Sequence, residues 1–429
     1  MLARWLYTLA FYLAIPALLF RLYQRGRDNP GYRQRIAERF GFSRHVPLKD
    51  SLWLHTVSVG EFMAAHPLVR RLLATYPDRA VLITTTTPTG SERVQAAFSA
   101  EIQSGRVVHA YLPYDLPDAL NRFMRRFNPR ILVVMETELW PNLIHGAHSR
   151  QIPILIANAR LSAKSARGYR KVALLTRPML RQVSVIAAQS EADGQRFTRL
   201  GLPPASLEVT GTVKFDLDVD PQVLEQAKAL REQWGRQRKV FIAASTHEGE
   251  DEQVLEAFRL IHCQLSDALL VLVPRHPERF DPVAALLAKH GWQTVRHSQS
   301  PMVTPQVQVV LGDVMGQMLK LLAAADVAFI GGSLEPVGGH NMLEPLAVGT
   351  PAITGPHVFN FQTVADLLTQ EGVLTTISSP LGLGQAVLAL FSDEGERQRL
   401  AQKGREVVER NRGALDQVLY HIQTLLSRS

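Results

Sequence analysis

The stretch Gly331–Pro351, GGSLEPVGGHNMLEPLAVGTP, decides the expected fold of this chain. The apolar run AAADVAFI at 323–330 predicts a buried strand, the glycines and Pro336 predict a loop, and NMLEPLAVG, which begins at Asn341, predicts a helix. Free N–H groups at the start of such a helix favour a phosphate, and Glu344 is placed to accept hydrogen bonds from ribose hydroxyls. A strand-to-helix turn whose glycines serve only packing is the alternative.

Strand-like and helix-like segments alternate on the N-terminal side of this stretch and continue beyond it. LWLHTVSV (52–59) and ILVVME (131–136) are examples from a first series, and a second series starts with KVFIAAST (239–246). Each apolar run is followed by an amphipathic helical run. Strict alternation predicts an α/β fold with parallel sheets, right-handed crossovers and ligands at the carboxyl ends of the strands. We therefore expect two Rossmann-like domains that face a cleft.

A length of 429 residues exceeds that of an ordinary single domain. We expect the chain to divide at the end of each series. The predicted segments are a membrane anchor at 1–27, an N-terminal acceptor-binding domain at 28–216, a C-terminal nucleotide-sugar domain at 217–383, and helices at 384–429 that pack back across the N-terminal domain.

The N-terminal segment is uncharged from Trp5 to Phe20 and is flanked by arginines. It is short for a full span, which needs about 20 apolar residues, and Pro16 interrupts it. We expect an uncleaved anchor that either spans the membrane or lies in its interface, with the body in the cytoplasm. A cleaved signal peptide and a buried helix of a soluble domain are the alternatives.

The composition and the missing motifs indicate which kinds of ligand and cofactor to expect. The formal charge of +8 indicates an anionic partner, and without a nucleic-acid motif this is acidic lipid or a phosphorylated substrate. The single cysteine, Cys263, excludes an internal disulfide, and its helical context predicts core packing. Missing P-loop and GxGxxG motifs argue against an NTPase and an NAD enzyme. With no aspartate pair of metal-binding type after a strand, we expect neither metal nor cofactor.

Three residues that follow predicted strands of the first series are candidate catalytic residues. Glu61 opens a helix, where an ionised carboxylate can act as the base of an inverting sugar transfer; a helix cap is the alternative. Glu136 ends an apolar strand, where a carboxylate is costly without a purpose or a basic partner. Lys214 can stabilise negative charge on the substrate, or it is a solvated lysine.

Two further loops of the second series are candidate nucleotide contacts. Pro274 and Arg275 follow a strand, and the arginine is suited to contact a phosphate while the backbone lines a base pocket. Met315, Gly316 and Gln317 open the helix after VVLGD, where N–H groups are available to the same ligand.

Taken together, these motifs closely resemble those of the 3-deoxy-D-manno-octulosonic acid (Kdo) transferases of Gram-negative bacteria. The resemblance covers essentially the whole chain, in the order SVGE, TTTTPTGSERV, METELWPN, GTVKFD, STHEGE, LVPRHPERF, GDVMGQM and GGHNMLEP. It implies a GT-B glycosyltransferase on the cytoplasmic face of the cell inner membrane. The implied reaction moves Kdo from CMP-Kdo to the lipid A precursor, lipid IVA, in lipopolysaccharide core biosynthesis.

The resemblance also implies roles for individual residues. Glu61 would be the general base of an inverting, metal-independent reaction, and Glu136 and Lys214 would stabilise the transition state. The implied CMP contacts are Pro274, Arg275, Met315, Gly316, Gln317, Asn341, Met342, Leu343 and Glu344. Met342 departs from the proline that often follows GGHN in the family. The alternatives are a UDP-sugar transferase or epimerase of the same fold, and a non-catalytic membrane-bound adaptor for acidic lipid.

Overall fold

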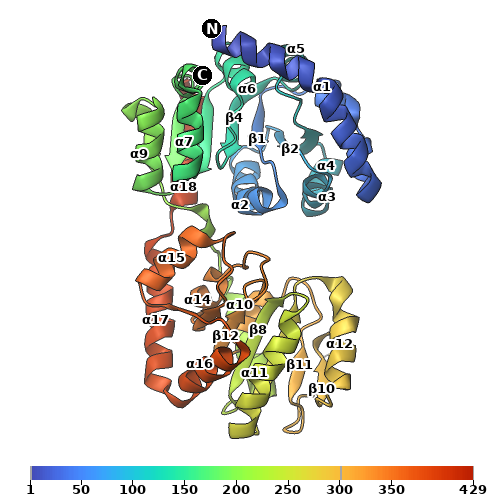
Figure 1. Ribbon diagram of the computed structural model, residues 1–429, viewed down its shortest axis with the longest axis vertical. Coiled ribbons are helices and arrows are strands. Elements are labelled where there is room, and N and C mark those ends of the chain that lie inside the picture. The colour runs from blue at the N-terminus through green and yellow to red at the C-terminus, as the bar shows by residue number, and fades with distance from the viewer. Residues whose placement is uncertain (1, 300–301, 429) are drawn as a thin grey trace. The chain divides into compact units, whose positions relative to one another are not determined.

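The computed structural model describes residues 2–299 and 302–428, and the chain forms two compact units (Figure 1). Unit 1 comprises residues 1–216 and 412–429, and unit 2 comprises residues 217–411. Met1 and Ser429, the outer ends of the predicted anchor and of the predicted C-terminal helices, lie outside the described residues, as do residues 300–301 of the predicted C-terminal domain.

A seven-stranded sheet forms the centre of unit 1, with the strand order β3-β2-β1-β4-β5-β6-β7. All of its neighbouring strands pair in parallel, for example Leu54 of β1 with Val133 of β4. The strands are β1 (Ser51–His55), β2 (Val81–Thr85), β3 (Val107–Tyr111), β4 (Pro129–Met135), β5 (Ile154–Ala159), β6 (Val185–Ala188) and β7 (Leu207–Val209).

Helices cover both faces of this sheet, so its strands are buried on both sides. Leu52 and Leu54 of β1 pack with one set of helices, whereas Trp53 between them packs with the other set, as the period of two along a strand requires. The helices and 3-10 turns are α1 (Leu2–Asp28), η1 (Pro30–Arg33), η2 (Ile36–Phe40), α2 (Val59–Thr75), α3 (Pro88–Ala97), α4 (Ser99–Gln103), α5 (Pro117–Phe127), α6 (Pro141–His148), α7 (Ala163–Lys171), α8 (Ala173–Leu180), α9 (Glu191–Leu200), η3 (Pro204–Ser206), η4 (Val213–Phe215) and α18 (Ala414–Arg428).

Unit 2 repeats the architecture with the strand order β10-β11-β9-β8-β12-β13-β14, again all parallel. Its strands are β8 (Val240–Thr246), β9 (Leu269–Pro274), β10 (Thr294–Arg296), β11 (Val309–Leu311), β12 (Val327–Ile330), β13 (Ala352–Thr354) and β14 (Leu374–Thr376). Its helices and 3-10 turns are α10 (Pro221–Trp234), α11 (Glu250–Gln264), η5 (Pro277–Arg279), α12 (Phe280–Lys289), η6 (His297–Gln299), α13 (Met318–Ala323), α14 (Leu343–Val348), α15 (Gln362–Gln370), α16 (Pro380–Ser392) and α17 (Glu394–Arg410).

The predicted α/β class with two parallel-sheet Rossmann-like domains is confirmed, with differences in detail. The short edge strands β10 and β14 were not predicted. The segment 384–429 is divided between the units: α17 packs on α14 and α16 of unit 2, and only α18 packs on α2, β4 and β5 of unit 1. The side chain of Cys263 is exposed, so the predicted core packing of this residue is wrong.

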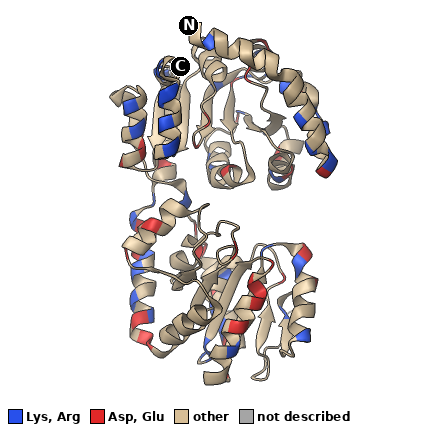
Figure 2. Cartoon of the chain, in the orientation of Figure 1, with Lys and Arg blue, Asp and Glu red and all other residues tan. Residues whose placement is uncertain are grey.

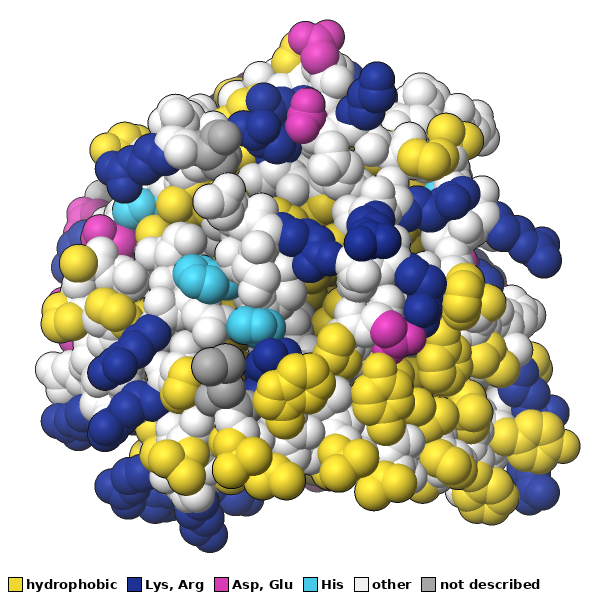
Figure 3. Space-filling model, turned by 90° about the horizontal axis from the view of Figure 1, so that it is seen from above, with side chains coloured by type: hydrophobic (Ala, Val, Ile, Leu, Met, Phe, Trp, Pro, Cys, Tyr) yellow, Lys and Arg dark blue, Asp and Glu magenta, His cyan; other side chains and the backbone are white. Residues whose placement is uncertain are grey.

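The N-terminal helix α1 is one continuous helix through Pro16 and has the length and hydropathy of a candidate membrane span. Figure 2 shows Lys and Arg gathered on α7 and towards the C-terminal end of α1. Figure 3 views the side of unit 1 on which α1 lies and shows hydrophobic side chains along one edge, with basic side chains beside them. The helix therefore exposes apolar surface, as an anchor does and a core helix does not.

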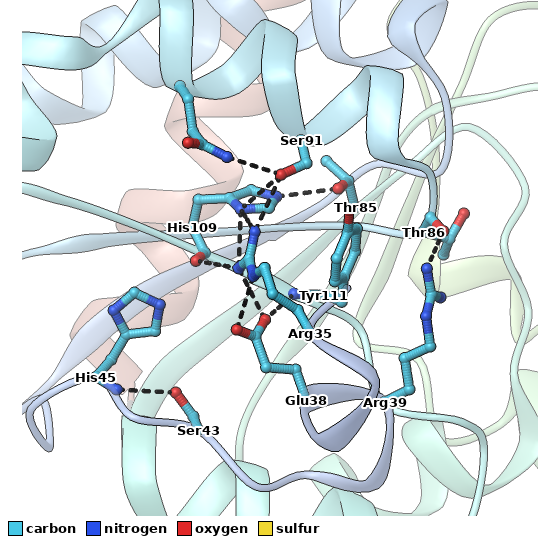
Figure 4. A network of polar contacts seen from close by, with 11 residues as sticks. Arg35, Glu38, Arg39, Ser43, His45, Thr85, Thr86, Ser91, His109 and Tyr111 are labelled. Carbon is cyan, nitrogen blue, oxygen red and sulfur yellow. Dashed lines mark hydrogen bonds and ion pairs between the residues drawn. The ribbon is translucent and has the colours of Figure 1, made fainter. Parts of the chain in front are cut away.

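A polar network fastens the segment after α1 to the sheet (Figure 4). The Arg35 guanidinium donates to Ser91 Oγ and to the carbonyl of His109, both at 3.1 Å, and forms an ion pair with Glu38 at 2.8 Å. Glu38 in turn accepts from the backbone N–H of Tyr111 at 2.9 Å. Burial lowers the pKa of His109 to about 3, so its neutral imidazole can accept from Arg35. The network fixes η2 at the carboxyl ends of β2 and β3.

We expect Gly41→Ala to destabilise unit 1 strongly, because Gly41 ends η2 at φ 78° and a Cβ there would lie 2.1 Å from the carbonyl oxygen of Ala119. The matched control is Gly105→Ala, where φ is 75° but no atom lies within 4 Å of the added Cβ. The control should cost about 1–2 kcal/mol for the left-handed backbone, and Gly41→Ala should cost about 1–3 kcal/mol more for the clash. Urea unfolding in detergent measures both; equal costs would contradict the tight contact.

Candidate functional site

The order of strands in unit 1 reverses between β1 and β4, which are neighbours in the sheet. In open parallel sheets, the loops that leave the carboxyl ends of two such strands diverge and leave room for a ligand. Glu61 follows β1, and Glu136 follows β4. The two carboxylates singled out by the sequence are therefore at this switch point.

Glu61 is held at the start of α2 by a capping arrangement. Its backbone N–H donates to the Oγ of the N-cap Ser58, while its carboxylate accepts from Ser58 Oγ at 3.2 Å and from the N–H of Val57 at 2.7 Å. Burial, with smaller contributions from the charges of Glu136 and Glu138, raises the pKa of Glu61 to about 7. The capping interpretation of Glu61 is confirmed, and the raised pKa is compatible with the predicted role as a base.

Glu136 and Lys214 lie close enough for their charges to interact. Burial lowers the pKa of Lys214, and the negative charge of Glu136 opposes that effect. Glu136 has a φ of 56°, a conformation that is costly for a non-glycine residue and that clusters at functional sites. Its N–H donates to the carbonyl of Ala157 at 2.9 Å, and Asn158 Oδ1 accepts from Val213 N at 3.3 Å, so the ends of β4 and β5 hold the loop that carries Lys214.

A third carboxylate, Glu138, belongs to the same cluster and was not among the candidates named from the sequence. Its Oε2 accepts from the indole Nε1–H of Trp140 at 3.0 Å. Burial raises its pKa, and the charge of Glu136 adds to that effect. Three carboxylates and one lysine thus form an electrostatic cluster, in which Glu61 is the group whose pKa is raised to about 7.

In unit 2 the corresponding reversal lies between β8 and β12. The fully buried carboxylate of Glu250 connects the loops that follow these strands. Its oxygens accept from four backbone N–H groups, those of His247 at 2.9 Å, Gly332 at 2.6 Å, Ser333 at 2.8 Å and Leu334 at 2.9 Å. The N–H groups directly after β12 therefore bind a carboxylate of the chain itself, and a phosphate would bind further along the loop.

Two histidines line the same loops. The rings of His247 and His340 stack at a 6° interplanar angle, with 2.7 Å between their Nε2 atoms. Burial, followed by the charges of His247 and Arg275, lowers the pKa of His340 to about 3. The pKa of Glu344 is raised, because the effect of burial exceeds the opposing effects of the hydrogen bond from Asn341 and the charge of Arg275. Arg275, which follows β9, therefore lies close enough for its charge to act on both His340 and Glu344.

The structure places the predicted nucleotide contacts on three loops at the carboxyl edge of this sheet. Pro274 and Arg275 follow β9, Met315 to Gln317 follow β11, and Asn341 to Glu344 follow β12. Met342 and Leu343 are fully buried, whereas Asn341 and Glu344 on either side of them are partly exposed. The helix α14 begins at Leu343, later than the predicted start at Asn341, because the Asn341 side chain accepts from the Leu343 N–H at 3.1 Å.

Sequence reasoning missed the roles of Glu250 and His247. Both stand in the loop STHEGEDE, which was named from the sequence only as part of the family resemblance. The signal that was available is the same as for Glu61, a carboxylate in the first turn of a helix that directly follows an apolar strand. What the sequence could not supply is the partner loop, which lies more than 80 residues further along the chain.

Comparisons with known proteins agree with this architecture. Residues 34–217 match the family model described as 3-deoxy-D-manno-octulosonic-acid transferase (kdotransferase), and residues 225–407 match that of group 1 glycosyl transferases. The 3-deoxy-D-manno-octulosonic acid transferase of Haemophilus influenzae is 44% identical over 429 residues, which cover 99% of each chain. The protein of the same name from Bordetella pertussis is 36% identical over 425 residues, covering 97% of this chain and 98% of the relative.

A solved structure supports the fold alone. The UDP-GlcNAc 2-epimerase of Neisseria meningitidis superposes with a TM-score of 0.56 over 89% of this chain and 100% of that chain, at 15% sequence identity. The two parallel-sheet units thus have the GT-B arrangement of elements.

The raised pKa of Glu61 predicts how stability changes with pH. Because its folded pKa of about 7 exceeds the ordinary value of 4.5 for a glutamate, the folded state binds this proton more tightly, and stability is lost as the pH rises from about 4.5 to about 7. Relative to Glu61→Gln, the parent protein should therefore lose up to about 3 kcal/mol between pH ~5 and pH ~8. Thermal unfolding at both pH values measures this difference. The exposed Glu92→Gln serves as a control, and parallel pH profiles for the parent and Glu61→Gln would contradict the assignment.

Glu250→Gln should destabilise unit 2 by about 3 kcal/mol or more, because an amide group has only one acceptor oxygen and would leave buried N–H groups unpaired. The matched control is Glu248→Gln, two residues away and exposed. Denaturant unfolding compares the two variants. Equal stability would show that the four N–H groups do not depend on the carboxylate.

Proposed function

Since the chain belongs to the 3-deoxy-D-manno-octulosonic acid transferase family and is a glycosyltransferase, we propose that it moves Kdo from CMP-Kdo to the lipid A precursor, lipid IVA, with Glu61 as the general base. The observation that carries the mechanism is the position of Glu61: a buried carboxylate with a pKa of about 7 at the switch point of unit 1. A base works best when its pKa lies near the operating pH.

The proposed reaction is a single displacement. A hydroxyl oxygen of the acceptor attacks the anomeric carbon of Kdo, its proton passes to Glu61, and the bond from that carbon to the phosphate oxygen of CMP breaks with its electron pair. The configuration inverts because the base and the leaving group stand on opposite sides of the sugar ring. CMP departs with one additional negative charge.

Glu136 and Lys214 are proposed to stabilise the transition state. The ammonium group of Lys214 lies in the field of Glu136, and burial makes that interaction stronger than it would be in water. The backbone of Glu136, at the end of β4, has a φ of 56°, and functional sites are where such a conformational cost is often retained.

The loops of unit 2 are proposed to bind CMP. Arg275 supplies a positive charge beside Glu344, and Asn341 Nδ2 donates to Glu344 Oε1 at 3.1 Å, which orients that carboxylate. Met315 and Gly316 are exposed, and Gly316 has an open φ of 80° with no atom within 4 Å of an added Cβ, so the ligand can approach the backbone closely. CMP has a single phosphate, which one cation and several N–H groups can hold without a metal ion or another cofactor.

The proposed location is the cytoplasmic face of the cell inner membrane, where the acceptor is itself a lipid. The exposed apolar face of α1 and the arginines that follow it support contact with a membrane that carries anionic lipid. Nucleic acid is not proposed as a partner.

The first test is the ligand dependence of thermal unfolding in detergent with CMP, UDP or NAD. A ligand at roughly 100 times its dissociation constant adds about 2.7 kcal/mol to stability. CMP alone should raise the melting temperature. Stabilisation by UDP and not by CMP would overturn the proposed donor and favour a UDP-sugar enzyme of the same fold. A transfer assay with CMP-Kdo and lipid IVA then tests the whole reaction.

Glu61→Gln should fold, retain CMP binding and lose transfer by roughly 100-fold or more, as general bases contribute about 10²–10⁴-fold. In the parent protein, kcat/KM should rise with pH through an apparent pKa near 7, and the Gln variant should lack that rise. The variant Glu92→Gln, exposed on α3, is the control. Normal transfer by Glu61→Gln would remove this residue from the mechanism.

A further inference from the structure

The helix α1 has an unusual division between its two faces. Residues at helical spacing face unit 1, among them Arg4, Thr8 and Leu22. The opposite face, up to Phe20, is exposed and uncharged: Leu2, Trp5, Leu6, Leu9, Ala10, Leu13, Pro16, Ala17 and Phe20. The outward face is thus apolar and without charge, although the inward face also carries apolar residues such as Phe11 and Leu22. A surface helix of a soluble domain turns its apolar stripe inward and a polar face to the solvent.

Near its N-terminal end, α1 is fastened to unit 1 by buried polar side chains. Thr8 and Asn142 are 3% and 2% exposed, and Asn142 Nδ2 donates to Thr8 Oγ1 at 2.9 Å. Asn142 Oδ1 accepts from Arg4 Nη1 at 3.1 Å, and its Nδ2 also donates to the carbonyl of Asp115 at 2.7 Å. Pulling α1 away would leave these buried groups of α6 without partners, which costs about 1–3 kcal/mol per group.

The contacts continue to the other end of the helix. Tyr12 donates to Asp118 of α5 at 2.5 Å, and the ring of Phe11 lies 6.2 Å from that of Tyr114. Arg33, the last residue of η1, donates to the carbonyl of Tyr23 at 3.0 Å, and Gly26 is buried against it. From Arg4 to Gly26 the helix covers roughly 33 Å at about 1.5 Å per residue.

That distance exceeds the hydrocarbon core of a bilayer, which is about 30 Å thick. A helix attached to the domain over this whole length can cross the membrane only if the domain crosses with it or if the buried polar contacts break. Neither is required when the helix axis is parallel to the membrane plane, since the apolar face then enters the lipid while the polar face stays on the protein.

We propose that α1 is a monotopic anchor that lies flat in the interface of an anionic bilayer, with its apolar face in the lipid and without spanning the membrane. This inference rests on the membrane location given under the proposed function and specifies its geometry. The occupant of the exposed face is therefore a lipid surface.

The charges around the helix fit this occupant. Arg21, Arg25 and Arg27 are exposed beyond the apolar section of α1. The helix α7 carries four exposed basic side chains and no acidic one among residues 163–171, and it packs on α8, which packs on α1. Basic residues near an anionic surface each contribute about 1 kcal/mol to binding. Trp5 and Tyr23 are exposed aromatic residues of the kind enriched at the lipid interface.

The depth of the helix in the membrane tests the proposal. The full chain with Cys263→Ser is given one fluorescently labelled cysteine at Leu6, Leu13 or Phe20, three exposed positions at seven-residue spacing on one face. It is bound to vesicles of phosphatidylethanolamine and phosphatidylglycerol at about 3:1. Nitroxide lipids carry the quencher either near the glycerol or near the end of the acyl chain. A label at Tyr420, exposed on α18, is the control.

A flat helix predicts equal quenching at the three α1 positions, stronger from the shallow nitroxide than from the deep one, and little quenching at Tyr420. A spanning helix predicts that Leu13 is quenched most by the deep nitroxide and that a cysteine at Leu6 resists an impermeant reagent added outside; either result overturns the proposal. A mass that doubles with concentration together with unquenched labels would mean that a second copy covers the face, which also overturns it.

Substitutions without labels provide a second measurement. Leu13→Glu should weaken partitioning onto the vesicles roughly tenfold, whereas Leu381→Glu, exposed on α16, should leave it unchanged. Transfer to a detergent-dispersed acceptor separates this inference from the proposed function. Transfer without vesicle binding would overturn the flat anchor and leave Kdo transfer standing; a flat anchor without transfer would overturn the proposed function alone.

Discussion

Parallel pairing of β1 with both β2 and β4 is the constraint on which the candidate site of unit 1 depends. Since the connections on the two sides of β1 leave the sheet in opposite directions, the carboxyl ends of β1 and β4 cannot be covered by the same helix. Glu61 and Glu136 come from these two ends. Unit 2 repeats the arrangement at β8 and β12, and there the chain fills part of the opening with its own carboxylate, Glu250.

The buried carboxylates of Glu250 and Glu61 differ in the number of hydrogen bonds that they accept, and this difference distinguishes a structural residue from a candidate catalytic one. Glu250 accepts from four backbone N–H groups, which connect two loops through its carboxylate and make it part of the scaffold. Glu61 accepts from one backbone N–H and one hydroxyl while two further carboxylates lie close, and burial raises its pKa to about 7. With only two donors to stabilise its charged form, the Glu61 carboxylate is suited to exchange a proton near neutral pH.

Much of the fold was predictable because it depends on local patterns. Apolar runs of strand length that alternate with amphipathic helices specify a parallel sheet, and the longer strands were predicted within a few residues. The three-residue strands β10 and β14 carry too few residues for a pattern. The placement of α17 depends on tertiary contact: Gly404 allows Leu346 of α14 to approach, with an added Cβ only 2.9 Å from Leu346 Cδ2. Nothing in the sequence near Gly404 identifies that partner.

The candidate site was predictable to a similar extent, and for the same reason. Glu61 could be found because a carboxylate in the first turn after a strand is visible locally, whereas the pairing of His247 with His340 joins residues 93 positions apart. The orientation of the N-terminal helix in the membrane likewise depends on a contact between residues far apart in the sequence. Both of its faces are apolar enough to predict an anchor, and hydropathy therefore could not distinguish a spanning helix from a flat one. Asn142, 134 residues from Thr8, supplies the missing information, because a buried polar contact fixes which face of the helix is left for the lipid.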